Sequence, residues 1–191
     1  MPTGVTAYRF ASTITSVNPG TGYIAWTNPT NVGADDDSWA TAQVTNKDQH
    51  TYWLRCIDFG FSSDDFPVGC TIDGIELVAL HKWTYIGIPE SGGITDAQIY
   101  ARKTSGQVGA NHASAVVWPE AETTCSYGGP GDGWGVSWTA SEVTSADFGI
   151  DYMVYVDNMA STSTTISVDY LKLRIFYGPP RPAPMASVLT F

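Results

Sequence analysis

Charged residues are scarce in this sequence, and basic ones scarcer still. Only 15% of its 191 residues are charged, whereas 43% are hydrophobic, the opposite of the balance found in disordered chains. Nine Lys and Arg stand against nineteen Asp and Glu, which gives a formal net charge of -10. Because phosphate contacts need basic side chains, we expect no nucleic-acid partner and no binding to an anionic membrane surface.

Long hydrophobic runs are also missing, and cysteines are few. No stretch approaches the roughly 18 apolar residues of a membrane-spanning helix, and residues 1–5 show no basic or apolar leader. Cys56, Cys70 and Cys125 are odd in number and form no CxxC pair. We therefore expect small buried side chains rather than a disulfide framework or a zinc site.

The local motifs of common enzymes are absent as well. The sequence has no GxSxG, no HExxH, no P-loop and no GxGxxG that opens a helix. Its three histidines are scattered and none lies in a ligand-spaced pair. Acidic pairs that could hydrolyse a glycoside occur near 64–65 and 120–122, but nothing singles out one pair. The sequence therefore predicts a protein that binds or assembles rather than an enzyme.

Strand patterns dominate what is present. Runs of β-branched and aromatic residues are separated by Gly, Pro and Ser/Thr clusters. Alternation is clearest in 148–157, where apolar residues occupy every second position. The expected strands are 6–14, 38–45, 51–59, 72–79, 96–103, 114–118, 122–127, 148–157 and 164–177. We predict an all-β, jelly-roll-like antiparallel β-sandwich of about eight or nine strands.

Three of the expected strands change their alternation partway along. In 51–59 the apolar positions pass from Tyr52, Leu54 and Cys56 to Ile57, Phe59 and Phe61. In 164–177 they change parity near 169–171, and in 72–79 they change parity at Gly74. The last two changes predict a β-bulge, which a glycine accommodates well at position 74. One short helix is expected where Thr139 and Glu142 have the spacing of a capping box.

We divide the chain into a β-sandwich domain, 1–177, and an extended arm, 178–191. The arm begins with a Pro-rich run, which favours a polyproline conformation, and ends in apolar residues. A second apolar segment is the Gly- and Pro-bounded loop 81–94. From these two segments we predict the contacts that hold an assembly together: Trp83, Tyr85, Ile86, Met185, Val188, Leu189 and Phe191.

Two further interpretations concern bound ligands. The run Asp35, Asp36 and Asp37 is a candidate calcium site, because hard cations favour several carboxylate oxygens on a loop. A polar turn before a strand explains the same residues, so we expect no cofactor. Aromatic residues in or beside loops could instead stack on sugar rings, although such residues also fill sandwich cores. They are Trp83, Tyr85, Tyr127, Trp134 and Trp138.

Three segments together resemble a known group of proteins. The first is WTNPTN at 26–31, with DDD at 35–37 and WA at 39–40. The second is LRCIDFGFS at 54–62, leading to FPVGCTIDGIE at 66–76. The third runs from Trp138 through FGID at 148–151 to ISVDY at 166–170 and IFY at 175–177. Their order resembles jelly-roll-like structural proteins of tailed bacteriophages, which are head decoration (cement) or tail-associated components.

The resemblance implies a non-enzymatic virion protein, made in the host cytoplasm, that decorates and stabilises the capsid lattice. Its partners would be the major capsid protein or another virion protein, and further copies of itself in a homo-oligomer such as a trimer. Two alternatives remain open. One is a carbohydrate-binding β-sandwich module of a phage tail or cell surface, and the other is the subunit of a self-assembling filament.

Overall fold

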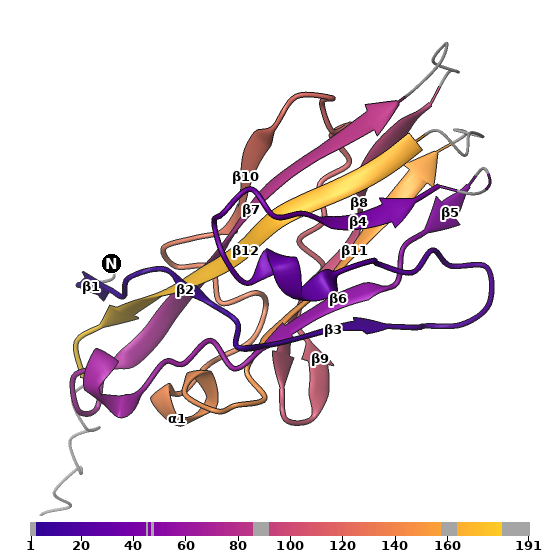
Figure 1. Cartoon of the computed structure of the whole chain (residues 1–191). Helices are drawn as coiled ribbons and strands as arrows, with labels where there is room; N and C mark the ends of the chain where they lie inside the picture. Colours follow the sequence, from indigo (N-terminus) through magenta and orange to yellow (C-terminus); the bar gives the residue numbers. More distant parts are fainter. Residues whose placement is uncertain (1–2, 45, 47, 86–91, 158–163, 181–191) are drawn as a thin grey trace, which may run out of the picture.

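The structure is a computed structural model that describes residues 3–44, 46, 48–85, 92–157 and 164–180. It is an all-β protein in which two antiparallel sheets form a sandwich (Figure 1). These two sheets confirm the predicted fold class. Within the described residues, no helix has the length and apolar character needed to cross a membrane.

One sheet, here called the β12 sheet, is built around the two longest strands. These are β7 (Thr71–Tyr85) and β12 (Thr164–Gly178), which pair along almost their whole length. The sheet order is β1-β12-β7-β10, and β2 and β4 also pair with β12. The shorter strands are β1 (Gly4–Val5), β2 (Arg9–Phe10), β4 (Ala40–Gln43) and β10 (Thr123–Gly128).

The second sheet, the β11 sheet, has the order β3-β6-β11-β8-β9, with β5 also paired to β11. Its strands are β3 (Thr13–Val17), β5 (Gln49–His50), β6 (Trp53–Ile57), β8 (Gly93–Lys103), β9 (Gly106–Val108) and β11 (Gly149–Asp157). Short helical segments complete the described chain: η1 (Pro29–Val32), η2 (Ser63–Asp65) and α1 (Ala140–Val143). The strand β11 is central, since it pairs with both β6 and β8.

The core lies between the sheets and follows the predicted alternation. In β11 and at the residue just before it, the five residues expected on one apolar face are all fully buried: Phe148, Ile150, Tyr152, Val154 and Val156. They meet the inward residues of β12, among them Leu171 and Leu173. Burial of these aliphatic and aromatic side chains is the main stabilising contribution in such a sandwich.

Both predicted bulges are present. The pairing of β12 with β7 shifts register between Val168 and Tyr170, so Asp169 is the unpaired residue. It shifts again beside Gly74, where a Cβ atom would clash with the carbonyl oxygen of Gly129. A glycine is therefore required there by close approach of the backbone.

The strand boundaries differ from the prediction in three places. The structure has twelve strands in its described residues, because several are only two or three residues long. The expected strand 6–14 is divided between β2 and β3, with a break at Ala11. The expected strand 114–118 is wrong: this segment is irregular, although the Trp118 amide donates to the Ile94 carbonyl oxygen of β8, at 2.7 Å.

The predicted capping box also forms. The Glu142 amide donates to Thr139 Oγ1 at 3.2 Å, and the Thr139 amide donates to Glu142 Oε2 at 2.9 Å. Two amides at the start of α1 donate to side-chain oxygens in this way, which fixes where the helix begins. Lys103 Nζ, at the end of β8, then donates to Glu142 Oε1 at 2.7 Å. The single α-helical turn is thus tied to the β11 sheet.

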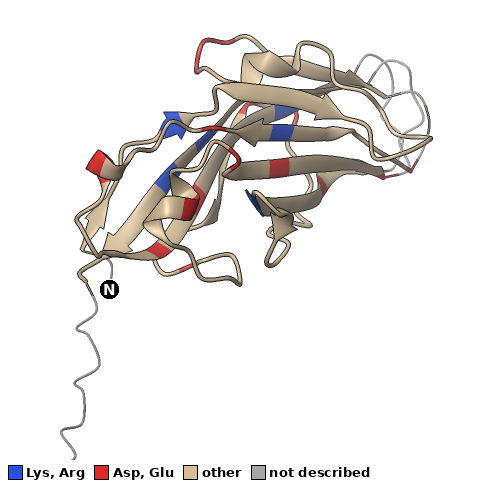
Figure 2. Cartoon of the chain, turned by 90° about the horizontal axis from the view of Figure 1, so that it is seen from below, with Lys and Arg blue, Asp and Glu red and all other residues tan. Residues whose placement is uncertain are grey.

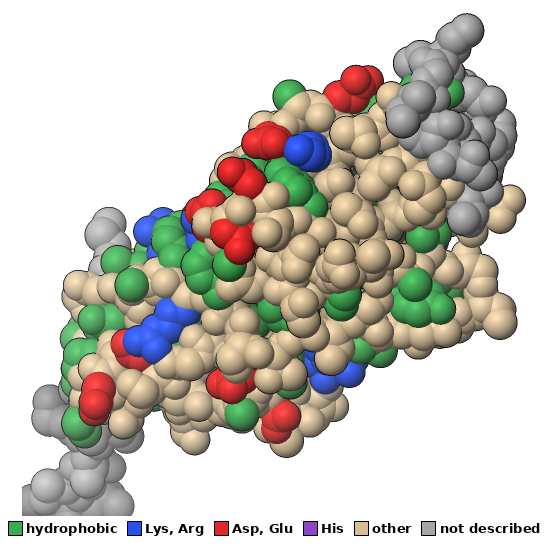
Figure 3. Space-filling view, viewed as in Figure 1, with side chains coloured by type: hydrophobic (Ala, Val, Ile, Leu, Met, Phe, Trp, Pro, Cys, Tyr) green, Lys and Arg blue, Asp and Glu red, His purple; other side chains and the backbone are tan. Residues whose placement is uncertain are grey.

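Charged residues are distributed unevenly over the elements. Every Lys and Arg in the described residues lies in a strand, whereas many acidic residues lie in turns (Figure 2). On the surface shown in Figure 3, side chains of both signs are mixed rather than gathered into a patch of one sign. On the outside of the β12 sheet, Arg174 pairs with Glu76, and Lys82 pairs with Glu122 at 2.9 Å.

Candidate functional site

The outward side chains of the β11 sheet form the most distinctive surface of the molecule. In β6, Leu54 and Cys56 point into the core, so Trp53 and Arg55 point outward. The pairing register places Arg55 opposite Asp151 of β11, and Asp151 opposite Tyr100 of β8. We call this surface the β11 face and define it by Trp53, Arg55, Gln98, Tyr100, Arg102, Gln107, Asp151, Met153 and Tyr155.

An aromatic pair spans the middle of the β11 face. The Trp53 and Tyr100 ring centroids are 6.4 Å apart, with an interplanar angle of 57°. The two residues belong to β6 and β8, which flank β11; Tyr100 is paired with Asp151 of β11, and the neighbouring Met153 is paired with Gln98. Met153 is only 3% exposed although it points outward. The rings therefore form a half-buried apolar platform on an otherwise polar sheet face.

A charged network lies directly beside this platform. Asp151 Oδ1 accepts from Arg55 Nε at 3.0 Å, and Asp151 Oδ2 accepts from Arg102 Nη1 at 2.7 Å. Gln107 Nε2 donates to the same Oδ2 at 2.7 Å. The Asp151 side chain is 0% exposed, whereas those of Arg55 and Arg102 are 30% and 15% exposed. A fully buried carboxylate thus holds two partly exposed guanidinium groups in place.

A second aromatic group lies further along the same sheet. The His50 ring centroid is 4.8 Å from that of Tyr155 and 5.8 Å from that of Tyr23. Burial lowers the pKa of His50, which favours a neutral imidazole near pH 7. The pKa of Tyr155 is raised, first by burial and then by the nearby Asp48 and Asp157. This end of the sheet therefore carries uncharged rings at neutral pH.

The arrangement suits a ligand that has both apolar flat sides and many hydroxyl groups. Half-buried rings offer large apolar contact area at little cost in conformational entropy. Guanidinium and amide groups held by Asp151 offer hydrogen bonds in fixed directions. These two features, side by side on a sheet, provide contacts of the kind that a sugar ring can make.

The aromatics that the sequence suggested for sugar stacking are placed elsewhere. Trp83, Trp134 and Trp138 are 7%, 0% and 6% exposed, and Tyr127 is 6% exposed. The Trp83 indole donates to the Trp118 carbonyl oxygen at 2.8 Å, and the Trp134 indole donates to that of Ile75 at 3.0 Å. The expectation that these rings are exposed is therefore wrong, and backbone carbonyl oxygens accept from the three indole N–H groups inside the core.

The predicted assembly contacts receive no support from this arrangement. Trp83 is part of the core, and Tyr85 is half-buried at the end of β7. The remaining predicted contacts lie outside the described residues: Ile86, Met185, Val188, Leu189 and Phe191. Their role in assembly stays a prediction.

The three candidate calcium ligands form an exposed turn. Asp35 Oδ2 lies 3.4 Å from Lys172 Nζ, and Asp36 Oδ1 accepts from the Ser38 amide at 3.0 Å. Asp37 has a left-handed backbone, with φ of 60°. Across the described parts of the chain, no three His, Cys, Asp or Glu side chains are grouped to hold a metal ion. Calcium binding at Asp35, Asp36 and Asp37 thus stays a prediction.

A cysteine and a histidine do meet in space. Cys125 Sγ lies 3.5 Å from His81 Nε2, and the Tyr152 hydroxyl lies 3.4 Å from His81 Nδ1 and donates to Asp96 at 2.9 Å. Burial lowers the pKa of His81 to about 4 and, together with Asp96, raises the pKa of the Cys125 thiol. Both groups are therefore neutral near pH 7, which does not suit a thiolate nucleophile.

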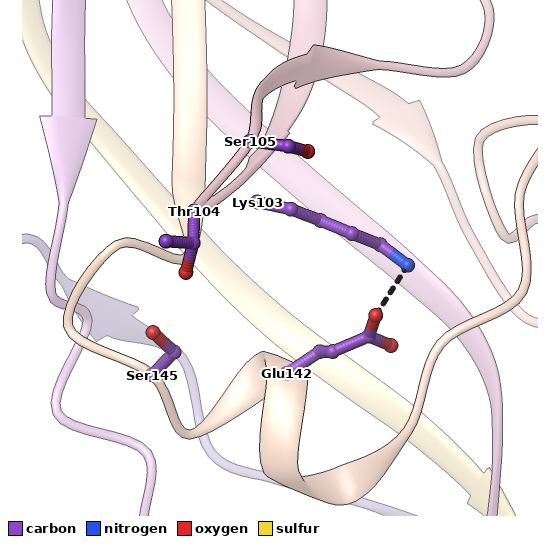
Figure 4. A pocket seen from close by; sticks show the side chains of 5 residues that line it. All are labelled: Lys103, Thr104, Ser105, Glu142 and Ser145. Carbon is purple, nitrogen blue, oxygen red and sulfur yellow. Dashed lines mark hydrogen bonds and ion pairs between the residues drawn. The ribbon is translucent and has the colours of Figure 1, made fainter.

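A small surface cavity of about 240 Å³ lies between the β8–β9 turn and α1 (Figure 4). Its lining includes Lys103, Thr104 and Ser105 on one side, and Glu142 and Ser145 on the other. The ion pair between Lys103 and Glu142 spans it. The two charged groups that line this cavity already neutralise each other. Their ion pair anchors α1 to the end of β8, so we do not regard the cavity as a ligand site.

Comparison with known proteins finds only distant similarity, and only to solved structures. No family model and no curated protein matches the chain. Among solved structures it is similar to one titled "BiXyn10A CBM1 APO", with 11% identity, a TM-score of 0.40, and coverage of 88% of this chain and 96% of that one. It is also similar to the CBM22-1 xylan-binding domain of Paenibacillus barcinonensis Xyn10C, with 10% identity, a TM-score of 0.39, and coverage of 94% and 97%.

A third similar structure is the arabinose-bound α-L-arabinofuranosidase MgGH51, with 12% identity and a TM-score of 0.43. The match covers 90% of this chain but 27% of that one. None of these likenesses is close enough to transfer an activity.

The sequence did not reveal the β11 face. Trp53, Arg55 and Asp151 occupy outward positions of their strands. The alternation that predicts these strands concerns the apolar inward positions. One sequence pattern could have pointed to this face. An aromatic residue stands two positions before an arginine in Trp53-Leu54-Arg55 and again in Tyr100-Ala101-Arg102. Only the pairing of both strands with β11 places these repeats together.

Proposed function

We propose that this protein is a non-catalytic carbohydrate-binding β-sandwich whose ligand lies on the β11 face. The observation that supports this most is the position of the Trp53 and Tyr100 rings beside the Asp151 network on one sheet surface. The rings would stack on the apolar sides of sugar units. Arg55, Arg102 and Gln107 would hydrogen-bond the hydroxyl groups and fix the orientation of the chain.

A binding role is favoured over hydrolysis by the carboxylates of the β11 face. Glycosidases normally use two carboxyl groups on either side of the scissile bond. Asp151 is the one carboxylate among the residues that define the face, and it is fully buried and paired with two arginines. It is placed to support the arginines rather than to exchange protons with a ligand.

The test is a glycan array on the intact protein, followed by calorimetric titration of the saccharides that bind. The variants Trp53→Ala and Tyr100→Ala should each weaken binding about tenfold, since stacking on a half-buried ring contributes roughly 1–2 kcal/mol. Trp39→Ala is the matched control, because Trp39 is also half-buried but lies against Lys82 of the β12 sheet.

Equal loss of affinity in the Trp39 variant would place the ligand elsewhere on the molecule. Full affinity in the Trp53 and Tyr100 variants, with unchanged melting temperature, would exclude the β11 face. An array without any bound saccharide would contradict the carbohydrate function itself.

Decoration of a phage head and assembly of a filament remain predictions with no observation in their favour among the described residues. The contacts proposed for them are buried, as at Trp83, or lie outside those residues. A capsid partner, a homo-oligomer and a virion location likewise remain untested. A carbohydrate-binding module is compatible with either a phage tail or a cell surface, and the structure favours neither.

A further inference from the structure

We propose that the β11 face selects acidic saccharides, with Arg55 and Arg102 binding the carboxylate of a uronic acid unit. This inference rests on the proposed carbohydrate function and specifies its ligand class. Three features of the face support it: its charge balance, the free donors of the two arginines, and the positions of these arginines relative to the aromatic rings.

The charge balance at the centre of the β11 face is positive. Two guanidinium groups surround a single carboxylate, which leaves one uncompensated positive charge. The chain as a whole has a formal net charge of -10. Other cationic side chains are paired with acids: Lys82 with Glu122, Lys103 with Glu142, and Arg174 with Glu76. The centre of the β11 face therefore attracts an anion, whereas most of the surface repels one.

The two arginines have donors to spare. Arg55 uses Nε and Nη2 on Asp151, and Arg102 uses Nη1. Arg55 Nη1 and Arg102 Nη2 have no hydrogen-bond partner among the described residues. A guanidinium group presents five N–H donors in a planar fork, a geometry that matches a carboxylate. Asp151 thus orients both groups from below without using all their donors.

The spacing of rings and arginines fits one kind of ligand. Trp53 precedes Arg55 by two residues in β6, and Tyr100 precedes Arg102 by two residues in β8. Two residues along a strand correspond to about 7 Å, so each ring lies one step from a guanidinium group on the same surface. A uronic acid has a pyranose ring that can stack and, attached to that ring, a carboxylate. A sugar unit above a ring would direct this group towards an arginine.

The experiment compares three oligosaccharides on the intact protein by calorimetric titration. They are an oligogalacturonate, the same oligosaccharide with its carboxylates reduced to alcohols, and a sulfated oligosaccharide of equal length. We expect the oligogalacturonate to bind about five- to tenfold more tightly than its reduced form. The preference should nearly disappear at about 1 M salt, where the screening length falls to about 3 Å.

Variants assign the preference to particular residues. Arg55→Gln should reduce the ratio of the two affinities to near one, and Arg55→Lys should restore part of it. Arg174→Gln is the matched control, because Arg174 is 32% exposed and paired with Glu76 on the opposite sheet. This control should keep the full preference. Circular dichroism of each variant checks that the fold is intact.

Each remaining outcome bears on one of the two proposals. Equal binding of both uncharged and acidic forms, lost in Trp53→Ala, would overturn acid selectivity and leave the carbohydrate function standing. Tighter binding of the sulfated form would overturn the assignment to a carboxylate. A preference that survives in Arg55→Gln and Arg102→Gln would overturn the assignment to these residues. If none of the three binds and an array shows no hit, the carbohydrate function itself fails.

Discussion

Among the individual residues, Asp169 has an unusual environment. This residue is 0% exposed at the β12 bulge, and neither of its carboxylate oxygens has a hydrogen-bond partner among the residues that the structure describes. Burial raises its pKa from 3.8 to about 6, with further contributions from Asp35, Asp37, Asp36 and Glu122. A carboxylate that must lose its hydration without gaining a partner opposes folding when it is ionised.

The sign of the pH effect follows from this raised pKa. The folded state holds the Asp169 proton more tightly than the unfolded state, so this residue lowers the free energy of unfolding as pH rises from about 4 through about 6. Asp169→Asn should therefore be more stable than the parent protein at pH 8, by about 1–3 kcal/mol. Urea unfolding at pH 8, 6 and 4 should show the difference shrinking towards zero at the lowest pH.

A less stable Asp169→Asn at pH 8 would mean that the carboxylate has a stabilising partner. Repeating the urea series with and without calcium distinguishes the cause. A gain in stability with calcium that is confined to the parent protein would support a cation near the Asp35–37 turn.

At the scale of elements, the Asp151 network joins four strands of the β11 sheet through side chains. Arg55 belongs to β6, Asp151 to β11 and Arg102 to β8, and Gln107 adds β9. Asp151 is fully buried, so removing one partner of this network should cost much more stability than removing one partner of an exposed ion pair. The same network also sets the directions of the guanidinium groups on the β11 face.

Removing the Asp151 charge should be costly. Asp151→Asn leaves two neighbouring arginines without a counter-charge, and we expect a loss of about 2–4 kcal/mol in the free energy of unfolding. Glu122→Gln is the matched control, since the Lys82–Glu122 pair lies on the other sheet and Glu122 is 50% exposed. Urea unfolding at pH 7 should show less than about 1 kcal/mol for this control. Equal effects of the two substitutions would contradict a structural role for the network.

How far the sequence predicts these elements depends on which side of a strand is considered. Inward positions follow a simple rule, since alternate apolar residues face the core, and this rule located β11, β12 and both bulges. Outward positions follow no such rule: Arg55 and Asp151 look like ordinary solvated residues until the register pairs them. Aromatic residues in Gly-rich loops were predicted at the surface but lie in the core. Trp134 is an example: its indole N–H donates to the Ile75 carbonyl oxygen, so the ring can be buried without an unsatisfied donor.

At the scale of the whole molecule, the sandwich presents two outer surfaces of different character. On the β12 sheet, aromatic rings are covered by cations of the same chain, as where Lys172 lies 4.1 Å from the Tyr170 ring centroid and Arg174 lies 4.5 Å from that of Tyr8. On the β11 face, the rings of Trp53 and Tyr100 lie beside guanidinium groups that are held by Asp151. Among the described residues, the β11 face is therefore the surface that leaves both rings and donors for a ligand.

The most direct test of this account is an amide chemical-shift titration of the intact protein with a saccharide found to bind. The account predicts that the largest shifts occur in β6, β8 and β11, around Trp53, Tyr100 and Asp151, and that the indole N–H signals of Trp83 and Trp134 barely move. Shifts concentrated in the β12 sheet or in the loops at the ends of the sandwich would contradict it.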